Sequence, residues 1–280
     1  MQSGFLQQGN TTIEIKLPEA TDEVIRGVKW GLVCAFPTPA YWKYQVLARR
    51  LQGAPIRYRL GRTLKEEVAA CLLGGHGIPA AVGLSAFDHL KHLGAFEGHS
   101  PSEATLTEWL GQPIAHGDRT IRYRFVKQKS KYLAAALNKI DSHPAPLGTG
   151  RELRDWLLDI PGIGYKTASW IARNWLDADD VAILDIHILR AGLLGGFFPE
   201  GLTVERHYLD LEERFLEFSR GLDTKASELD AVIWHEMMSA PNTVKSIMDG
   251  RASVTPTRPS RARRSAKQRH TDPNQFVLVG

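Results

Sequence analysis

The most constraining feature of this sequence is a pair of short amphipathic segments joined by a Pro-Gly-Ile-Gly turn. Apolar residues recur at helical spacing over 153–160 and again over 168–175, which predicts a helix on each side of the turn. Pro161 ends the first helix because proline has no amide donor. Gly162 and Gly164 predict a hairpin too tight for side chains at either position. Such a hairpin presents free N–H groups at the start of the second helix, which favours phosphate binding.

Most of the remaining chain shows the same helical spacing of apolar residues, with short loops that contain Gly or Pro. Alternation of apolar and polar residues is clearest over 12–17 and 121–126, which favours two short strands. The expected fold class is therefore all-α, with at most a minor sheet. We expect helices over 63–73, 78–93, 106–110, 130–140, 206–218 and 227–238.

Composition and cysteine content exclude several classes of protein. The 280 residues are 43% hydrophobic and 24% charged, which is typical of a soluble protein with a sizeable core. The two cysteines, Cys34 and Cys71, are too few for a disulfide framework or for a four-thiolate iron–sulfur cluster. The longest apolar run, 30–36, is too short to cross a membrane, and no secretory signal is visible. We expect an intracellular protein with no membrane partner.

Positive charge is concentrated in two segments. Residues 251–280 contain seven Lys or Arg and one acid, with three prolines and no apolar period, which predicts a disordered basic tail. Such a tail attracts nucleic acid through counterion release, or serves only for solubility or localisation. The second segment, 119–131, contains six Lys or Arg and no acid. Taken alone, it fits the solvated face of a buried element better than a surface that follows phosphates.

The turn and its surroundings resemble a known superfamily. The pattern Leu-x-x-Ile-Pro-Gly-Ile-Gly-x-Lys-Thr-Ala begins at Leu157, and Asp-Ile-His follows 19 residues after Lys166. This combination is similar to the helix–hairpin–helix DNA glycosylases, and most similar to their 8-oxoguanine DNA glycosylase branch. Endonuclease III shares the lysine and the aspartate but carries an iron–sulfur cluster. The strong similarity covers about 40 residues, and a weaker one extends through 72–76 and 129–137.

The resemblance implies two helical lobes with the active site in the cleft between them. One lobe would combine residues 1–69 with 188–250. The other would span 70–187 and contain the helix–hairpin–helix motif at 152–175, and the tail would follow over 251–280. The resemblance further implies a monomer that needs no catalytic metal and no cofactor. A structural monovalent cation held by the hairpin backbone is the one candidate ion.

Two residues carry the chemistry that the resemblance implies. Lys166 lies in the first turn of its helix, where the positive end of the helix dipole disfavours an ammonium and favours a nucleophilic amine. In the family this lysine attacks the sugar C1′, expels the base and forms a Schiff base. Asp185 is expected to cap the helix that follows it. In the family this aspartate handles the lysine's proton and stabilises the cationic sugar.

The resemblance also implies residues that bind DNA. Gly162 and Gly164 would hold the backbone through their N–H groups, and Lys129 would contribute to the same surface. His187 matches a histidine near the phosphate of the flipped nucleotide, and the alternative is a core or capping histidine. His76, in Gly-Gly-His-Gly, lies where relatives insert a polar wedge into the gap in the duplex, and the alternative is an ordinary loop histidine.

Aromatic residues are candidates for the base pocket. Trp170 lies one turn after the lysine, where the 8-oxoguanine enzymes place a small residue against the base. It would supply a stacking surface, narrow the pocket, or fill the core. Trp234 and His235 are further pocket candidates, because relatives line the pocket from a late helix, and Trp30 is a separate candidate near the start of the chain.

The sequence therefore predicts a DNA N-glycosylase with abasic-site lyase activity. It would act on double-stranded DNA that contains a modified base, such as an oxidised purine, and would be cytoplasmic and nucleoid-associated in a prokaryote. Because Trp170 departs from the family pattern, a bulky or foreign base, such as a modified cytosine, is an alternative substrate. A helix–hairpin–helix module that only binds DNA is the alternative without catalysis.

Overall fold

The computed structural model describes residues 1–53, 59–75 and 77–254, with side chains up to residue 250. The described chain is mostly helical, so the expected all-α class is confirmed. No helix in these ranges is long and apolar enough to cross a membrane. The helices are α1 (Pro39–Leu51), α2 (Leu64–Leu73), α3 (Ala80–His92), α4 (Glu103–Gly111), α5 (Val126–Ser142), α6 (Gly150–Leu158), α7 (Tyr165–Leu176), α8 (Ile186–Gly195), α9 (Tyr208–Gly221), α10 (Ala226–Ser239) and α11 (Pro241–Val254).

The strands form small antiparallel pairs at the edges of the helical body. The pairs are β1 (Gln2–Gln8) with β2 (Thr11–Leu17), β3 (Glu23–Ile25) with β4 (Val28–Lys29), and β5 (Ile114–His116) with β6 (Arg119–Ile121). The strand expected over 12–17 is confirmed as β2. The strand expected over 121–126 is wrong beyond Ile121. There Tyr123 turns inward and its hydroxyl donates to the carbonyl of Leu73 at 2.6 Å, and helix α5 begins at Val126.

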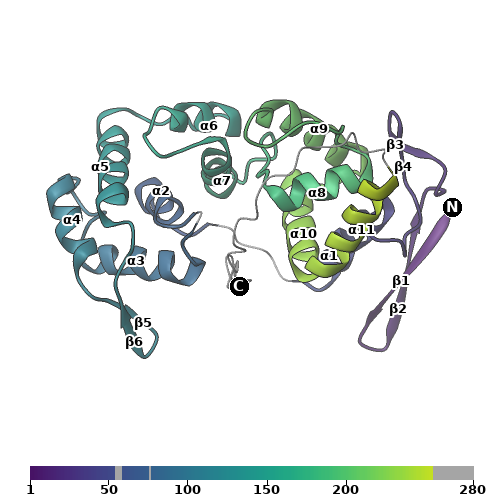
Figure 1. Cartoon of the computed structure of the whole chain (residues 1–280), viewed down its shortest axis with the longest axis horizontal. Helices are drawn as coiled ribbons and strands as arrows, with labels where there is room; N and C mark the ends of the chain where they lie inside the picture. Colours follow the sequence, from purple (N-terminus) through teal and green to yellow (C-terminus); the bar gives the residue numbers. More distant parts are fainter. Residues whose placement is uncertain (54–58, 76, 255–280) are drawn as a thin grey trace.

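Two hydrophobic cores divide the described chain. The first lies within α2–α7 and, with β5 and β6, forms what we call the first lobe. The second lies within α1 and α8–α11 and, with β1–β4, forms the second lobe. Figure 1 shows the two lobes side by side. Val181 belongs to the first core and Ala182 to the second, so the chain passes between lobes just before α8. The lobe boundaries expected at 69/70 and 187/188 stay a prediction.

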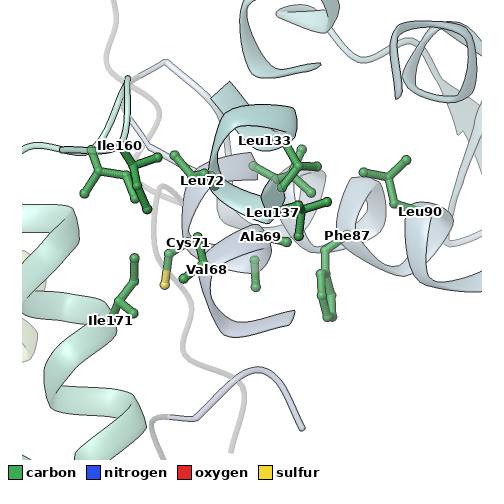
Figure 2. Packing of buried hydrophobic residues seen from close by; sticks show 14 of the residues in the cluster. Val68, Ala69, Cys71, Leu72, Phe87, Leu90, Leu133, Leu137, Ile160 and Ile171 are labelled. Atoms are coloured by element: carbon green, nitrogen blue, oxygen red, sulfur yellow. The ribbon is translucent and has the colours of Figure 1, made fainter. Parts of the chain in front are cut away.

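Helix α2 lies at the centre of the first lobe because its sequence is apolar on almost every side. All its residues from Glu66 to Leu73 are buried. Figure 2 shows Val68 and Leu72 packed with side chains from α3, α5 and α7. Each fully buried side chain of this size contributes about 1.5–3 kcal/mol to folding. Helix α7 is therefore held in place along its length by α2, which fixes the helix that follows the Pro-Gly-Ile-Gly turn.

A buried polar network joins the two lobes next to α8. Arg154 on α6 forms an ion pair with Glu212 on α9, and both side chains are almost fully buried. Glu212 also accepts a hydrogen bond from the N–H of Ala182 at 3.0 Å. The hydroxyl of Tyr208 donates to the carbonyl of Ala182 at 2.7 Å and accepts from the N–H of Leu184 at 3.2 Å. Because breaking a buried pair typically costs about 3–5 kcal/mol, this network holds residues 182–184 firmly.

Two expected features fall at or beyond the limits of the described residues. Helix α11 continues to Val254, four residues into the segment expected as a tail, because Val244 anchors it in the second core. Residues 255–280, the greater part of that tail, lie outside the described residues, as does His76.

Candidate active site

The predicted helix–hairpin–helix motif is formed by α6, the turn 161–164 and α7. Gly162 has a φ of +85°, and a Cβ added there would lie 2.2 Å from a ring carbon of Tyr132 on α5. Only glycine fits, so the expectation for Gly162 is confirmed. Gly164 differs, because its φ is −103° and a Cβ there would meet nothing within 4 Å. The expectation that its side chain is sterically excluded is wrong for the protein without a ligand.

Helix α7 begins without the usual stabilising groups. Gly164 is the N-cap residue and provides no side-chain hydrogen bond, and the first turn contains no acidic residue. Lys166 is the second residue of the helix, and 40% of its side chain is exposed. A cation at this position is opposed by the helix dipole, and the first-turn N–H groups are available to an anion.

Helix α8 begins with the opposite arrangement. Asp185 is its N-cap residue, as expected, and its Oδ1 accepts from the N–H of His187 at 2.8 Å and of Ile188 at 3.1 Å. Its other oxygen, Oδ2, lies 3.6 Å from Nζ of Lys166. The cap bonds therefore fix the carboxylate with one oxygen directed at the lysine. A small approach of the two groups, or one water between them, would allow a proton to pass from the amine to the carboxylate, which is what a lysine nucleophile and its acid–base partner require.

A pocket opens beside this pair. Its volume is about 890 Å³ including space open to solvent. Both lobes contribute to its walls, so the expected position of the site in a cleft between lobes is confirmed. The lining residues are mostly apolar and are Leu60, Ala70, Gly74, Ala80, Gly83, Leu84, Lys166, Trp170, Arg173, Ile183, Asp185, Asp230, Ala231 and Trp234.

The aromatic pocket candidates separate into two groups. Trp170 and Trp234 line the pocket from α7 and α10, so the structure brings them together with Lys166. His235 does not line the pocket; its side chain is 52% exposed and lies 3.4 Å from a carboxylate oxygen of Glu236. Trp30 is also absent from the lining, because it is buried in the second core. Neighbouring positions on one helix point in different directions, which explains why Trp234 and His235 differ.

His187 lies close to the pocket without lining it. Its ring meets the ring of Trp234 edge to face, with centroids 6.3 Å apart. Burial lowers the pKa of His187, and the positive charges of Arg190 and Lys166 act in the same direction, while Asp185 opposes them. A largely neutral imidazole at the first turn of α8 can donate one hydrogen bond to a phosphate oxygen without adding a full charge. Its predicted DNA contact stays a prediction.

Lys129 does not point at open surface. Its ammonium donates to the carbonyls of Leu72 at 2.5 Å and Gly74 at 2.9 Å, at the end of α2. Burial lowers the pKa of Lys129. A cation at the negative end of a helix stabilises it, so this contact holds the loop that precedes residue 76. A direct contact between Lys129 and DNA stays a prediction.

The sequence reasoning missed two charged residues in the pocket wall. Arg173 and Asp230 are each about 5% exposed, with Nη1 and Oδ1 3.4 Å apart. Burial raises the pKa of Asp230 to about 6, and Arg173 opposes that shift. A signal was present, since Asp230 lies four residues before Trp234 and Arg173 lies three residues after Trp170. Helical spacing places each of them on the same face as its tryptophan.

Metal-binding residues do not cluster in the described ranges. No group of three or more His, Cys, Asp or Glu side chains there could hold a metal ion. The cysteines lie apart, with Cys34 exposed and Cys71 buried in the first core. Burial raises the pKa of the Cys71 thiol, and Glu67 adds to that effect.

Comparison with known proteins gives consistent matches. The profile of the family described as 8-oxoguanine DNA glycosylase matches residues 61–224. The 8-oxoguanine DNA glycosylase/AP lyase of Thermoplasma acidophilum is 35% identical over 119 residues, which are 41% of this chain and 57% of that protein. The protein of the same name from Methanocaldococcus jannaschii is 33% identical over 123 residues, or 42% of this chain and 58% of that protein. The matched region thus spans a little over half the length of these relatives.

Solved structures agree on the fold. The 8-oxoguanine DNA glycosylase of Thermotoga maritima aligns with a TM-score of 0.51 and 23% identity, over 70% of this chain and 96% of that one. The M. jannaschii enzyme aligns with a TM-score of 0.50 and 24% identity, over 70% of this chain and 92% of that one. Because the family profile covers more than half of the sequence, this chain belongs to the 8-oxoguanine DNA glycosylase family of helix–hairpin–helix proteins.

Proposed function

We propose that this chain is a DNA N-glycosylase with abasic-site lyase activity that removes an oxidised purine of the 8-oxoguanine type from double-stranded DNA. The observation that carries the proposal is the 3.6 Å approach of Lys166 Nζ to Asp185 Oδ2 at the mouth of the pocket. The names of the curated relatives support the same reaction.

The glycosidic carbon is unreachable inside the base stack, so the target nucleotide must first rotate into the pocket. The neutral amine of Lys166 then attacks C1′ of the sugar while the C1′–N9 bond breaks and its electron pair leaves with the base. The carboxylate of Asp185 stabilises the positive charge that develops on the sugar, and it accepts the proton that the amine loses. The departing base takes up a proton and is released.

The lyase step continues from the same lysine. The sugar ring opens to a Schiff base between Lys166 and C1′, which makes the C2′ proton acidic. Removal of that proton by a base at the site expels the 3′-phosphate and breaks the strand, and water then hydrolyses the Schiff base to regenerate the amine.

The pocket wall supports a flat aromatic ligand. Trp170 and Trp234 provide broad apolar surfaces from two helices, and base-to-aromatic stacking is typically worth about 1–3 kcal/mol per base. The buried carboxylate of Asp230 adds an acceptor that suits a base edge with N–H donors. These features favour a purine with donors on its edge, and they leave a larger modified base as the competing substrate.

The test is a panel of duplexes that each contain one modified base, scored separately for base release and strand breakage. We expect release from 8-oxoguanine and a covalent adduct when borohydride is present. Release from a modified cytosine but not from 8-oxoguanine would establish the competing substrate. Tight binding to every duplex with no release from any would establish a module that only binds DNA.

A further inference from the structure

Five cations of the first lobe are left without acidic partners. They are exposed, and none of them forms an ion pair with a carboxylate in the described part of the chain. Elsewhere in the same lobe Lys65, Lys91 and Lys139 all do. We call this set the basic strip, and its members are Arg119, Arg122, Arg124, Lys127 and Lys131.

The strip follows β6 and the start of α5. Lys127 and Lys131 are four residues apart on α5, so they share one helical face, and Arg124 lies just before the helix begins. Lys127 and Lys131 lie about 6 Å apart along the helix axis. That is close to two phosphate steps of about 3.4 Å along one strand of a duplex. The strip therefore has the spacing of a backbone rather than of a single small anion.

Residues next to the strip in the chain contact parts of the candidate site. Lys129 bonds to the carbonyl of Gly74, a residue of the pocket wall. The ring of Phe125 lies 3.8 Å from the position of a Cβ at Gly77. Tyr132 packs against Gly162 in the hairpin. Because Phe125 adjoins Arg124 and Tyr132 adjoins Lys131 in the chain, the strip lies close to both Gly77 and the hairpin.

Local electrostatics disfavour these cations in the protein alone. Helix α5 begins without a side-chain cap and without an acid in its first turn, so its positive end faces more positive charge. Lys127 and Lys131 also repel each other at a spacing of four residues. Arrangements that break local stability rules without compensation are typical of binding surfaces. An anion with several charges removes the conflict.

We infer that the basic strip binds the phosphate backbone of the duplex beside the flipped nucleotide, and that it extends the contact made by the hairpin along one flank. The inference rests on the proposed function only for the identity of the partner, which is DNA. Phosphate contacts carry no sequence information, so the strip positions the duplex and leaves base selection to the pocket.

The test removes three of these charges together, as Arg124→Gln just before α5 and Lys127→Gln and Lys131→Gln on it, and measures affinity for an undamaged duplex across a range of salt concentrations. Each lost phosphate contact reduces the slope of log K against log salt by about 0.9, so we expect a reduction of about 2–3. The matched control is Lys16→Gln, Arg26→Gln and Lys29→Gln, three cations on β2–β4 at the far end of the molecule (Figure 1). Its slope should match that of the wild type.

Two further measurements show whether a change in the salt slope comes from lost charge or from lost folding. The thermal midpoint of the strip variant should not fall, because the substitution removes repulsion. A charge-retaining variant, Arg124→Lys with Lys127→Arg and Lys131→Arg, should keep the wild-type slope. An unchanged slope in the glutamine variant, or an equal loss in the control, would overturn the inference. Absence of base release from every lesion would overturn the proposed function alone, because this assay uses undamaged DNA.

Discussion

The two helices that begin at the pocket, α7 and α8, start in opposite ways. Asp185 caps α8 with two hydrogen bonds. Helix α7 starts at Gly164 with no side-chain cap and carries Lys166 in its first turn. A capped start stabilises the free protein, whereas an uncapped start keeps N–H groups and positive potential for a ligand. The capped start of α8 stabilises the protein and also orients the carboxylate of Asp185. The uncapped start of α7 is less stable, and it leaves N–H groups and Lys166 for binding and chemistry.

The same contrast runs through the first lobe. Helices α2, α4 and α6 have side-chain caps from Thr63, Ser102 and Thr149, and each has an acid in its first turn. Helices α3, α5 and α7 have neither. The contacts of Phe125 with Gly77 and of Tyr132 with Gly162 bring these three uncapped starts to one side. That side is the one on which we place the DNA.

The largest expected effect comes from replacing the lysine in the first turn of α7. Lys166→Gln should abolish both base release and the borohydride-trapped adduct, because an amide cannot form a Schiff base. DNA binding and the thermal midpoint should change little, since the side chain is 40% exposed. Trapping assays on a lesion duplex and on an abasic duplex measure the two steps separately. Continued cleavage by the glutamine variant would show that another residue is the nucleophile.

The second largest effect comes from replacing Asp185, the residue that caps α8. Asp185→Asn keeps the cap, because Asn and Asp cap helices about equally well, so the thermal midpoint should stay within a few degrees. The rate of base release should fall by roughly 10²–10⁴, because the charge that handles the proton is lost. Asp185→Ala should lose about 0.5–2 kcal/mol of stability as well. A normal rate of base release in the asparagine variant would show that Asp185 only caps the helix.

The third prediction concerns Asp230, the buried carboxylate in the pocket wall, in contrast to the capping carboxylate of Asp185. Asp230 has a pKa of about 6 in the folded protein against an ordinary value of 3.8. The folded protein therefore holds this proton more tightly than the unfolded chain, and the stability contributed by protonation is lost as pH rises from about 4 to about 6. Asp230→Asn does not titrate. We expect its stability relative to wild type to improve over that interval by about 3 kcal/mol in total.

Thermal or urea unfolding of both proteins at pH 4, 5, 6 and 7 measures this difference. The loss of the partner of Arg173 lowers the stability of the variant by a constant amount, so the change with pH is the diagnostic quantity. A difference that does not vary with pH would mean that Asp230 titrates as an ordinary aspartate.

The smallest effect converts one kind of helix start into the other. Gly164→Ser adds a capping side chain at a position with room for it, and should stabilise the free protein by a few tenths of a kcal/mol. It should also weaken DNA binding by about 0.5–1.5 kcal/mol, because the hydroxyl competes for an N–H group that the phosphate needs. Thr149→Ala on α6 is the opposite control, with a stability loss and unchanged affinity. Tighter DNA binding by the serine variant would contradict the assigned role of the hairpin.

Short-range patterns made part of this site predictable. Pro161 and Gly162 mark a tight turn, and an Asp after an apolar run marks a helix start, so the positions of Lys166 and Asp185 relative to their own helices followed from the sequence. Their mutual distance did not, because it depends on the docking of α7 against α8. The expectation that most of the fold is helical also rested on local spacing, and the family resemblance supplied the two lobes.

Other residues were beyond sequence reasoning for identifiable reasons. Helix α10 is buried on several sides, so its sequence places Asp230 on the same face as Trp234 but does not reveal that this face lines the pocket while His235 faces solvent. Lys129 reads as a surface cation in a basic segment, yet its partners are carbonyls more than fifty residues earlier in the chain. Tyr123 follows an alternating pattern, but a tertiary hydrogen bond to Leu73 decided its conformation.

The passage of the chain from one core to the other between Val181 and Ala182 has a consequence for control of the reaction. Lys166 belongs to a helix of the first lobe and Asp185 to a helix of the second, so neither lobe carries the reactive pair by itself. Under the proposed function, loosening of the Arg154–Glu212 contact would separate the nucleophile from its acid–base partner and leave the hairpin, which lies within the first lobe, intact. Docking of the two lobes is therefore needed, under the proposed function, for cutting but not for the contact that the hairpin makes with DNA.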